Sequence, residues 1–84
     1  MYYVYILKGS RTGRMYSGFS SNLRNRIAKH KSGGVHTTKR MGKIELIFYE
    51  AYKSEKDARR REKYFKTTKG KRSLRLMLKG SLKE

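Results

Sequence analysis

Two tyrosines, an arginine and a histidine in the first part of the chain are the side chains best suited to chemistry. They are Tyr5, Tyr16, Arg26 and His30. Arg26 and His30 are four residues apart, so in a helix they lie on one face. A guanidinium is a planar donor that stabilises charge on a phosphate, and an imidazole can orient a phenol or relay its proton. A tyrosine has an ordinary pKa of about 10, so it acts as a base only where cationic neighbours favour its ionised form. The sequence therefore predicts one small surface on which two phenols, a guanidinium and an imidazole converge.

A β-hairpin is predicted to position the two phenols. Met1 to Leu7 and Arg14 to Phe19 are rich in strand-forming residues, and the turn-prone segment Lys8 to Gly13 joins them. Because side chains alternate along a strand, we expect Tyr16 to face Tyr5 across the pair. The first strand is apolar on both faces, which predicts a central position in the sheet.

The guanidinium and the imidazole are predicted to lie on a helix that follows the hairpin at once. Ser20 or Ser21 is expected to cap this helix, which runs to about Lys31 before the segment Ser32-Gly33-Gly34 ends it. The next residues, Val35 to Gly42, have no hydrophobic periodicity and predict a loop.

A third strand and two further helices complete the predicted fold. Ile44 to Tyr52 alternates as a strand does, and Ser54 resembles the N-cap of a helix that continues through Lys66. The segment Thr67 to Lys71, which contains Gly70, breaks this pattern, and a final amphipathic helix follows. Its apolar residues are Leu74, Met77, Leu78 and Leu82. We expect a single domain over residues 1–84 of the α/β (α+β) class, with a small three-stranded antiparallel sheet flanked by helices.

Glu62 is unusual because it falls within the inward-facing stripe of the second long helix. Its apolar neighbours in that stripe are Ala58 and Phe65, at spacings of four and three residues. A carboxylate at such a position needs a partner, since burial of a bare charge costs several kcal/mol. One interpretation is an ordinary ion pair with Lys66 or Arg59 on the same helix.

The charge balance is the most extreme feature of the composition. Lys and Arg number 23 against 6 Asp and Glu, which gives a net charge of +17, and the cations are spread along the chain. Such a surplus indicates a polyanionic partner, first of all nucleic acid. There is no Cys for a disulfide or a thiolate metal site, and no apolar run approaches the ~20 residues that span a bilayer. We expect a cytoplasmic protein without a signal peptide and without a membrane partner.

Taken in order along the chain, these motifs resemble those of the GIY-YIG nuclease superfamily, in particular its small single-domain branch. The motifs are Tyr3-Val4-Tyr5, Tyr16-Ser17-Gly18, Arg26 with His30, and the late Glu62. The resemblance implies a metal-dependent DNA endonuclease in which Tyr5 or Tyr16 is the general base. The sequence does not distinguish the two phenols, and we favour Tyr5. It also implies that Arg26 stabilises the phosphate and that His30 supports a phenol. Glu62 would hold a single Mg²⁺ or Mn²⁺ ion, because a hard cation suits one carboxylate plus waters and phosphate oxygens.

The expected substrate is DNA (duplex, nicked or branched), cut on one strand. Residues that would contact its phosphates, and so position it without reading sequence, are His36, Lys39, Arg40, Arg59, Arg60 and Arg61. The alternative is a non-catalytic module that binds DNA or RNA with the same fold, since exposed aromatics on a sheet also stack single-stranded bases. Two departures support this alternative. Tyr3 stands where the superfamily has a glycine, and no Asn follows Asn25, although many relatives have one near the last helix.

Overall fold

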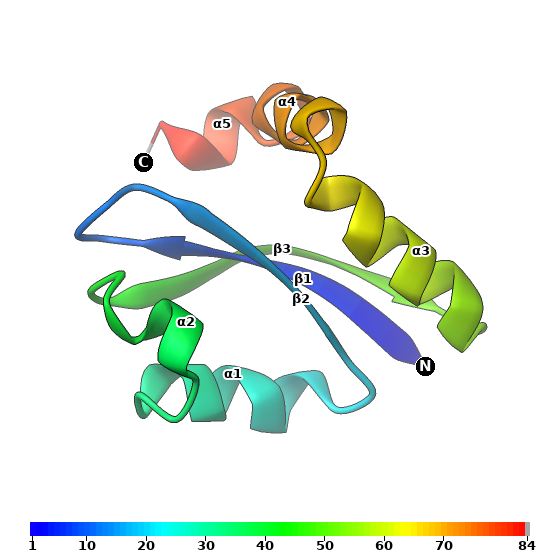
Figure 1. The fold of residues 1–84 in the computed structure, drawn as a ribbon, viewed down its shortest axis with the longest axis horizontal. Coiled ribbons are helices and arrows are strands. Elements are labelled where there is room, and N and C mark those ends of the chain that lie inside the picture. Colours follow the sequence, from blue (N-terminus) through cyan, green and yellow to red (C-terminus); the bar gives the residue numbers. More distant parts are fainter. Residues whose placement is uncertain (84) are drawn as a thin grey trace.

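A three-stranded antiparallel sheet forms the centre of the protein (Figure 1). The computed structural model describes residues 1–83, with the side chain of Thr37 left aside. The strands β1 (Tyr2–Gly9), β2 (Met15–Ser20) and β3 (Ile44–Tyr52) lie in the order β2-β1-β3. β1 is the central strand, as its two apolar faces predict, and its residues Val4 to Leu7 are wholly buried. The predicted fold class, with its predicted third strand, is confirmed.

Helices cover both faces of the sheet. α1 (Leu23–Lys31) and α2 (His36–Lys39) lie on one face, while α3 (Glu55–Phe65), α4 (Thr68–Met77) and α5 (Lys79–Leu82) lie on the other (Figure 1). None of the helices within residues 1–83 has the length and apolar character needed to cross a membrane.

Alternate residues of β1 supply a hydrophobic core on each side of the sheet. The core under α3 and α4 contains Val4, Ile6, Ala58, Phe65, Leu74 and Leu78. The core under α1 contains Tyr5, Leu7, Met41 and Ile44, with Leu23 and Ile27 of α1 packed against it. Removal of this apolar surface from water, at roughly 25 cal/mol per Å², is the main force that holds the helices to the sheet.

The strand register places Tyr5 opposite Gly18, and Tyr16 opposite Leu7. The prediction that Tyr16 faces Tyr5 directly is therefore wrong, because β2 is shifted by two residues from that pairing. Tyr16 still lies on the same face as Tyr5, with 6.4 Å between the two ring centroids. Gly18 is required here, since a Cβ at this position would collide with the ring and hydroxyl of Tyr5. The Tyr5 ring thus lies over Gly18, directed toward the β2 edge of the sheet.

The N-cap of α3 is the residue that the sequence predicts, whereas the N-cap of α1 is a different residue. Ser54 caps α3 as predicted, and its side chain accepts a hydrogen bond from the backbone N–H of Asp57. The cap of α1 is Asn22, not Ser20 or Ser21. The Ser20 side chain is instead bonded to the backbone of Asn22, which starts the helix later than predicted.

The helical pattern breaks at the start of the predicted range, because α3 ends at Phe65 and α4 begins at Thr68, and Gly70 itself lies inside α4. Thr67 caps α4, and its side chain accepts from the N–H of Gly70 at 3.0 Å. A Cβ at Gly70 would collide with the backbone carbonyl of Tyr64. Glycine is therefore present because α4 packs closely against the end of α3. Among the apolar residues of the predicted final helix, Leu74 and Leu78 are buried, whereas the side chain of Met77 is 45% exposed.

The segment Val35 to Gly42, predicted as a loop, contains the short helix α2. One helical turn is too short to show a hydrophobic period, so the sequence pattern could not reveal it. The helix matters because it carries Thr38, which is fully buried beside α1.

Candidate active site

A chain of buried hydrogen bonds connects Tyr5, His30 and Thr38 between the sheet and the helices α1 and α2. The Tyr5 hydroxyl oxygen lies 2.8 Å from Nε2 of His30, and Nδ1 of His30 lies 2.8 Å from Oγ1 of Thr38. Oγ1 of Thr38 donates to the carbonyl oxygen of Val35, so it accepts from the Nδ1–H of His30. This network leaves Nε2 as the acceptor for the proton of the Tyr5 hydroxyl; the tautomer is assigned from the bonding pattern.

His30 is only 2% exposed, and this burial controls its charge. Burial, and after it the positive charge of Arg26, lowers the pKa of His30. The imidazole is therefore neutral near pH 7, which agrees with its role as the acceptor of the Tyr5 proton.

Arg26 contacts the same phenolic oxygen. Its Nε donates to the Tyr5 hydroxyl at 3.3 Å, and this hydrogen bond is the largest cause of the raised pKa of Arg26; Tyr16 also contributes. For Tyr5, burial raises the pKa and outweighs the opposite effect of Arg26. The expected ionisation of this phenol by its cationic neighbours therefore does not occur in the protein alone, and Tyr5 carries its proton.

Tyr16 is the more accessible of the two phenols. It is half-buried, whereas Tyr5 has no exposed surface. The centroid of its ring lies 5.2 Å from that of His30 and 6.4 Å from that of Tyr5. The structure thus brings together the two phenols, the guanidinium and the imidazole that the sequence singles out.

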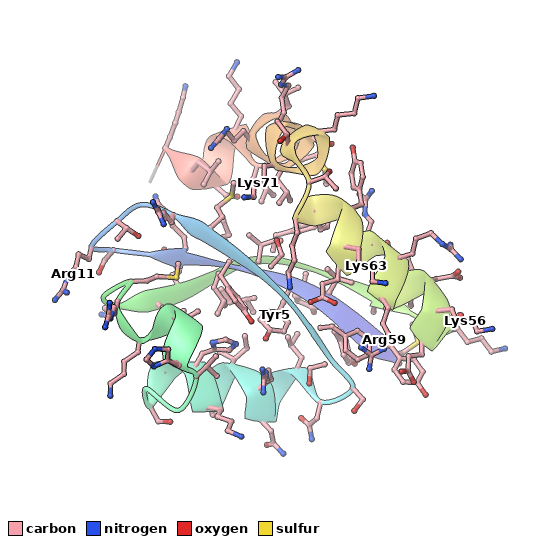
Figure 2. All side chains as sticks on the ribbon, in the orientation of Figure 1. Tyr5, Arg11, Lys56, Arg59, Lys63 and Lys71 are labelled. Carbon is pink, nitrogen blue, oxygen red and sulfur yellow. The ribbon has the colours of Figure 1, made fainter. Side chains whose placement is uncertain are left out.

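Glu62 lies on the helix that covers the opposite face of the sheet from this cluster. It lies on α3, whereas Arg26 and His30 lie on α1 (Figure 1). Its charge is nevertheless among the causes that raise the pKa of Tyr5, so the carboxylate is within electrostatic reach of the phenol. Figure 2 shows Tyr5 between α1 and the sheet, and on the other side of the sheet α3, from which Arg59 and Lys63 extend. Helix α3 packs against β1 and β2, and the guanidinium carbon of Arg59 lies 4.2 Å from the ring centroid of Phe19 on β2.

The carboxylate of Glu62 has a partner on its own helix. Its Oε2 accepts from Nζ of Lys66 at 2.9 Å, and the Glu62 side chain is 19% exposed. The ion pair considered from the sequence is therefore present. It engages Oε2, and the second oxygen, Oε1, is a further donor atom for a cation.

The donor atoms around Glu62 suit a hard cation held partly by substrate. Within residues 1–83 no three His, Cys, Asp or Glu side chains gather into a metal-binding group, so Glu62 would be the one protein ligand there. Structural and catalytic Zn²⁺ sites use three or four protein ligands, which these residues do not offer. Mg²⁺ keeps several waters and commonly takes one or two carboxylates with phosphate oxygens. The site therefore fits Mg²⁺ or Mn²⁺ bound together with a phosphate.

Arg61 differs from its two neighbours in the arginine run of α3. Its guanidinium donates to both oxygens of Glu50, at 3.0 and 3.2 Å, and lies 4.3 Å from the ring centroid of Phe65. The hydrogen bond to Glu50 is the main cause of its raised pKa. Tyr52 donates to the same carboxylate at 2.6 Å. Arg61 therefore joins α3 to β3, and its donors point into the protein.

The other predicted nucleic-acid contacts are on the surface. Arg59 and Arg60 pair with Glu55 and Asp57 of the preceding turn, yet their side chains are 55% and 75% exposed. Ion pairs of this kind contribute little, so both cations can exchange partners. The three candidates on and beside α2 are also exposed: His36, Lys39 and Arg40.

Thr38 is the site residue that sequence reasoning missed. A threonine in a polar, aperiodic segment is common, and its contact with His30 depends on α2. No motif or spacing in the sequence signals this contact.

The sequence and the fold of this chain have counterparts in known proteins. The GIY-YIG catalytic domain matches residues 1–75, and the chain belongs to the GIY-YIG family, a family of nuclease type. The resemblance drawn from the sequence motifs is thus confirmed.

The most informative relatives are UPF0213 proteins. One from Clostridium perfringens is 35% identical over 85 residues, which cover 100% of this chain and 90% of that protein. Another, from Staphylococcus haemolyticus, is 34% identical over 77 residues, 90% of this chain and 93% of that one. The solution NMR structure of the UPF0213 protein BH0048 from Bacillus halodurans is similar with a TM-score of 0.58 and 33% identity, over 92% of this chain and 85% of that chain.

Proposed function

We propose that the protein is a metal-dependent DNA endonuclease that hydrolyses one strand at the β2 edge of the sheet. The observation that carries this proposal is the meeting of Arg26 and His30 on one phenolic oxygen, that of Tyr5, with Tyr16 beside them. A fixed guanidinium next to an accessible phenol is what in-line attack on a phosphodiester requires, namely a charge stabiliser and a proton acceptor.

Arg26 is the group proposed to meet the phosphate. Its Nε is directed to Tyr5, and its terminal nitrogens can donate to phosphate oxygens as negative charge develops on them. Tyr5, His30 and Thr38 then act as positioning residues, because their buried hydrogen bonds hold the guanidinium in one orientation.

Tyr16 is proposed as the general base in place of the initially preferred Tyr5. Tyr16 is half-buried, whereas the Tyr5 hydroxyl is enclosed and already bonded to two partners. As the proposed general base, the Tyr16 oxygen takes a proton from the attacking water. The water oxygen bonds to phosphorus as the bond to the leaving oxygen breaks. The leaving oxygen takes a proton from solvent, and the phenol returns its own proton to solvent.

Glu62 is proposed to hold one Mg²⁺ or Mn²⁺ ion. When bound, such an ion would polarise the phosphate and stabilise the leaving oxygen. In the protein alone, Oε2 of this carboxylate is paired with Nζ of Lys66.

The proposed substrate is duplex, nicked or branched DNA. The net charge of +17 favours a polyanionic partner, and exposed cations lie on α3 and on and beside α2. Those proposed to contact phosphates are His36, Lys39 and Arg40 near α1, and Arg59 and Arg60 on α3. Arg61 is left out of this set because Glu50 holds its donors.

A non-catalytic nucleic-acid-binding module is the second candidate function. The ion pair between Glu62 and Lys66 favours it, because the one carboxylate suited to a metal already has a cationic partner. This module would bind DNA or RNA through the same basic surface without turnover.

A nicking assay separates the two functions. Supercoiled plasmid and branched oligonucleotides are incubated with the wild type, Glu62→Gln or Glu45→Gln, in Mg²⁺, Mn²⁺ or EDTA. Glu45 is an exposed carboxylate on β3 and serves as the matched control. We expect metal-dependent nicking by the wild type and by Glu45→Gln, and a loss of about 100-fold or more in Glu62→Gln. If the wild type and Glu62→Gln bind DNA equally and neither nicks it, the endonuclease proposal is rejected.

A further inference from the structure

A hollow of about 480 Å³ lies between α1 and β3, on the face of the sheet that carries α1. Tyr3 and Tyr49 line it from the sheet, and Arg24 and Ile27 line it from the helix. We propose that this hollow binds an unpaired nucleobase of the substrate strand, stacked on Tyr49. The inference rests on nucleic acid being the substrate of the proposed function, and it names the form of that substrate.

The aromatic side chains of the hollow are available for stacking. Tyr49 is 52% exposed although it is a large aromatic residue on a sheet. Its ring centroid lies 6.1 Å from that of Tyr3, with the planes inclined at 61°. The two rings therefore pack edge to face, and the ring of Tyr49 is open to solvent. Every base has a π-face, so an exposed tyrosine can receive any of the four.

The charge of the hollow selects a particular class of aromatic ligand. None of the residues that line it is acidic, and Arg24 supplies a positive charge at its wall. Ser21 and Asn22 add polar atoms at the end where α1 begins. A ligand that satisfies a tyrosine face, a guanidinium and short polar side chains is planar and carries a phosphate, which describes a nucleotide.

The position of the hollow connects it to the candidate active site. Tyr5 pairs with Gly18 on one side of β1 and with Tyr49 on the other. Cross-strand neighbours of this kind have their Cβ atoms about 4.5–5.5 Å apart. Helix α1 stands between the two places, since Arg26 contacts Tyr5 while Arg24 lines the hollow. A strand whose phosphate meets Arg26 can thus place a neighbouring base in the hollow by passing the start of α1.

A base can enter this hollow only when it is not paired and stacked in a duplex. The enzyme should therefore favour DNA with unpaired bases, such as flaps, branches or single-stranded segments, over continuous duplex. This preference would come from shape and stacking, without base-specific hydrogen bonds.

Binding measurements test this inference independently of cleavage. Fluorescence anisotropy gives the affinities of the wild type, Tyr49→Ala, Tyr49→Trp and Tyr64→Ala for a single-stranded oligonucleotide and for the matching duplex, over a range of salt. Tyr64 is an exposed tyrosine on α3 and is the matched control. We expect Tyr49→Ala to weaken single-strand binding by about tenfold or more, Tyr49→Trp to restore it, and Tyr64→Ala to leave it unchanged.

The salt dependence separates stacking from charge. Because Tyr49 contacts no phosphate in this account, the slope of log affinity against log salt should be the same in Tyr49→Ala as in the wild type. Equal single-strand affinity of the wild type and Tyr49→Ala would overturn the inference. An equal loss of affinity for single strand and for duplex in Tyr49→Ala would overturn it as well. So would a wild-type protein dimer that is lost in Tyr49→Ala, because the exposed Tyr49 would then serve contact between two copies of the chain. If the wild type fails to nick DNA while Tyr49 still governs single-strand binding, the proposed catalysis fails and the stacking site stands.

Discussion

Tyr5 connects the fold to the chemistry at the scale of a single residue. Its ring belongs to the core and lies over Gly18, while its hydroxyl is bonded to His30 and Arg26. A buried hydroxyl without a partner costs about 1–3 kcal/mol. The contacts that satisfy this hydroxyl therefore also fix the two helical side chains next to the candidate phosphate position.

The neutral state of buried His30 predicts how stability depends on pH. Its pKa is lowered in the folded protein, below the value of about 6.5 for an unfolded chain. The unfolded state consequently binds more protons as the pH falls, so this contribution is present above the unfolded pKa and is lost on acidification. We expect the urea midpoint, followed by circular dichroism, to fall between about pH 7 and pH 5.

The second histidine of the chain provides the control for this titration. His36→Gln replaces an exposed side chain and should keep the dependence on pH. His30→Gln should lower stability at pH 7 and flatten the curve across the same window. A wild type that is equally stable at both pH values would contradict a buried, neutral His30.

Individual residues of the site could be predicted from the sequence to different degrees. Arg26 and His30 follow from helical spacing, and Tyr5 and Tyr16 from strand alternation on one face. The shift in register between β1 and β2 could not be predicted, because it is set by the length of the turn and by the fit of Tyr5 over Gly18. The burial of Tyr5 also reverses the expected direction of its pKa.

At the scale of elements, the strands and α3 carry clear local signals, whereas α2 and the start of α4 do not. The helix after Ser54 could be predicted because Ser54 and Asp57 have the spacing of a capping box. Gly70 indicates a break by propensity, yet a tertiary contact with α3 requires it inside a helix. Local propensity is a weak guide where one helix packs against the end of another.

Two glycines in the last helices test this packing directly. Gly70→Ala should destabilise the protein by about 1–3 kcal/mol, because its methyl group meets the carbonyl of Tyr64. Gly80→Ala in α5 meets nothing within 4 Å and should be neutral or stabilise by up to about 1 kcal/mol. Chemical denaturation of both variants gives the comparison, and equal stabilities would refute the tight contact between α3 and α4.

At the scale of the whole molecule, the proposed site would draw on both faces of the sheet. Arg26 belongs to α1 on one face and Glu62 to α3 on the other (Figure 1). Amphipathic patterns show that each helix covers the sheet, but they do not tell which face it covers. The family motifs alone group Glu62 with Tyr5 and Arg26, and no hydrogen bond among the described residues joins Glu62 to either of them.

The coupling between Arg26 and Glu62 in DNA cleavage tests this shared site most directly. Single-turnover rates are measured at saturating branched DNA and Mg²⁺ for the wild type, Arg26→Lys, Glu62→Asp and the double variant. If both side chains act on the same phosphate, the second substitution removes little once the first has been made. The fold-loss in rate of the double variant should therefore be far smaller than the product of the fold-losses of the two single variants. Losses that simply multiply would show that the two side chains act independently, and would contradict a single active centre across the β2 edge.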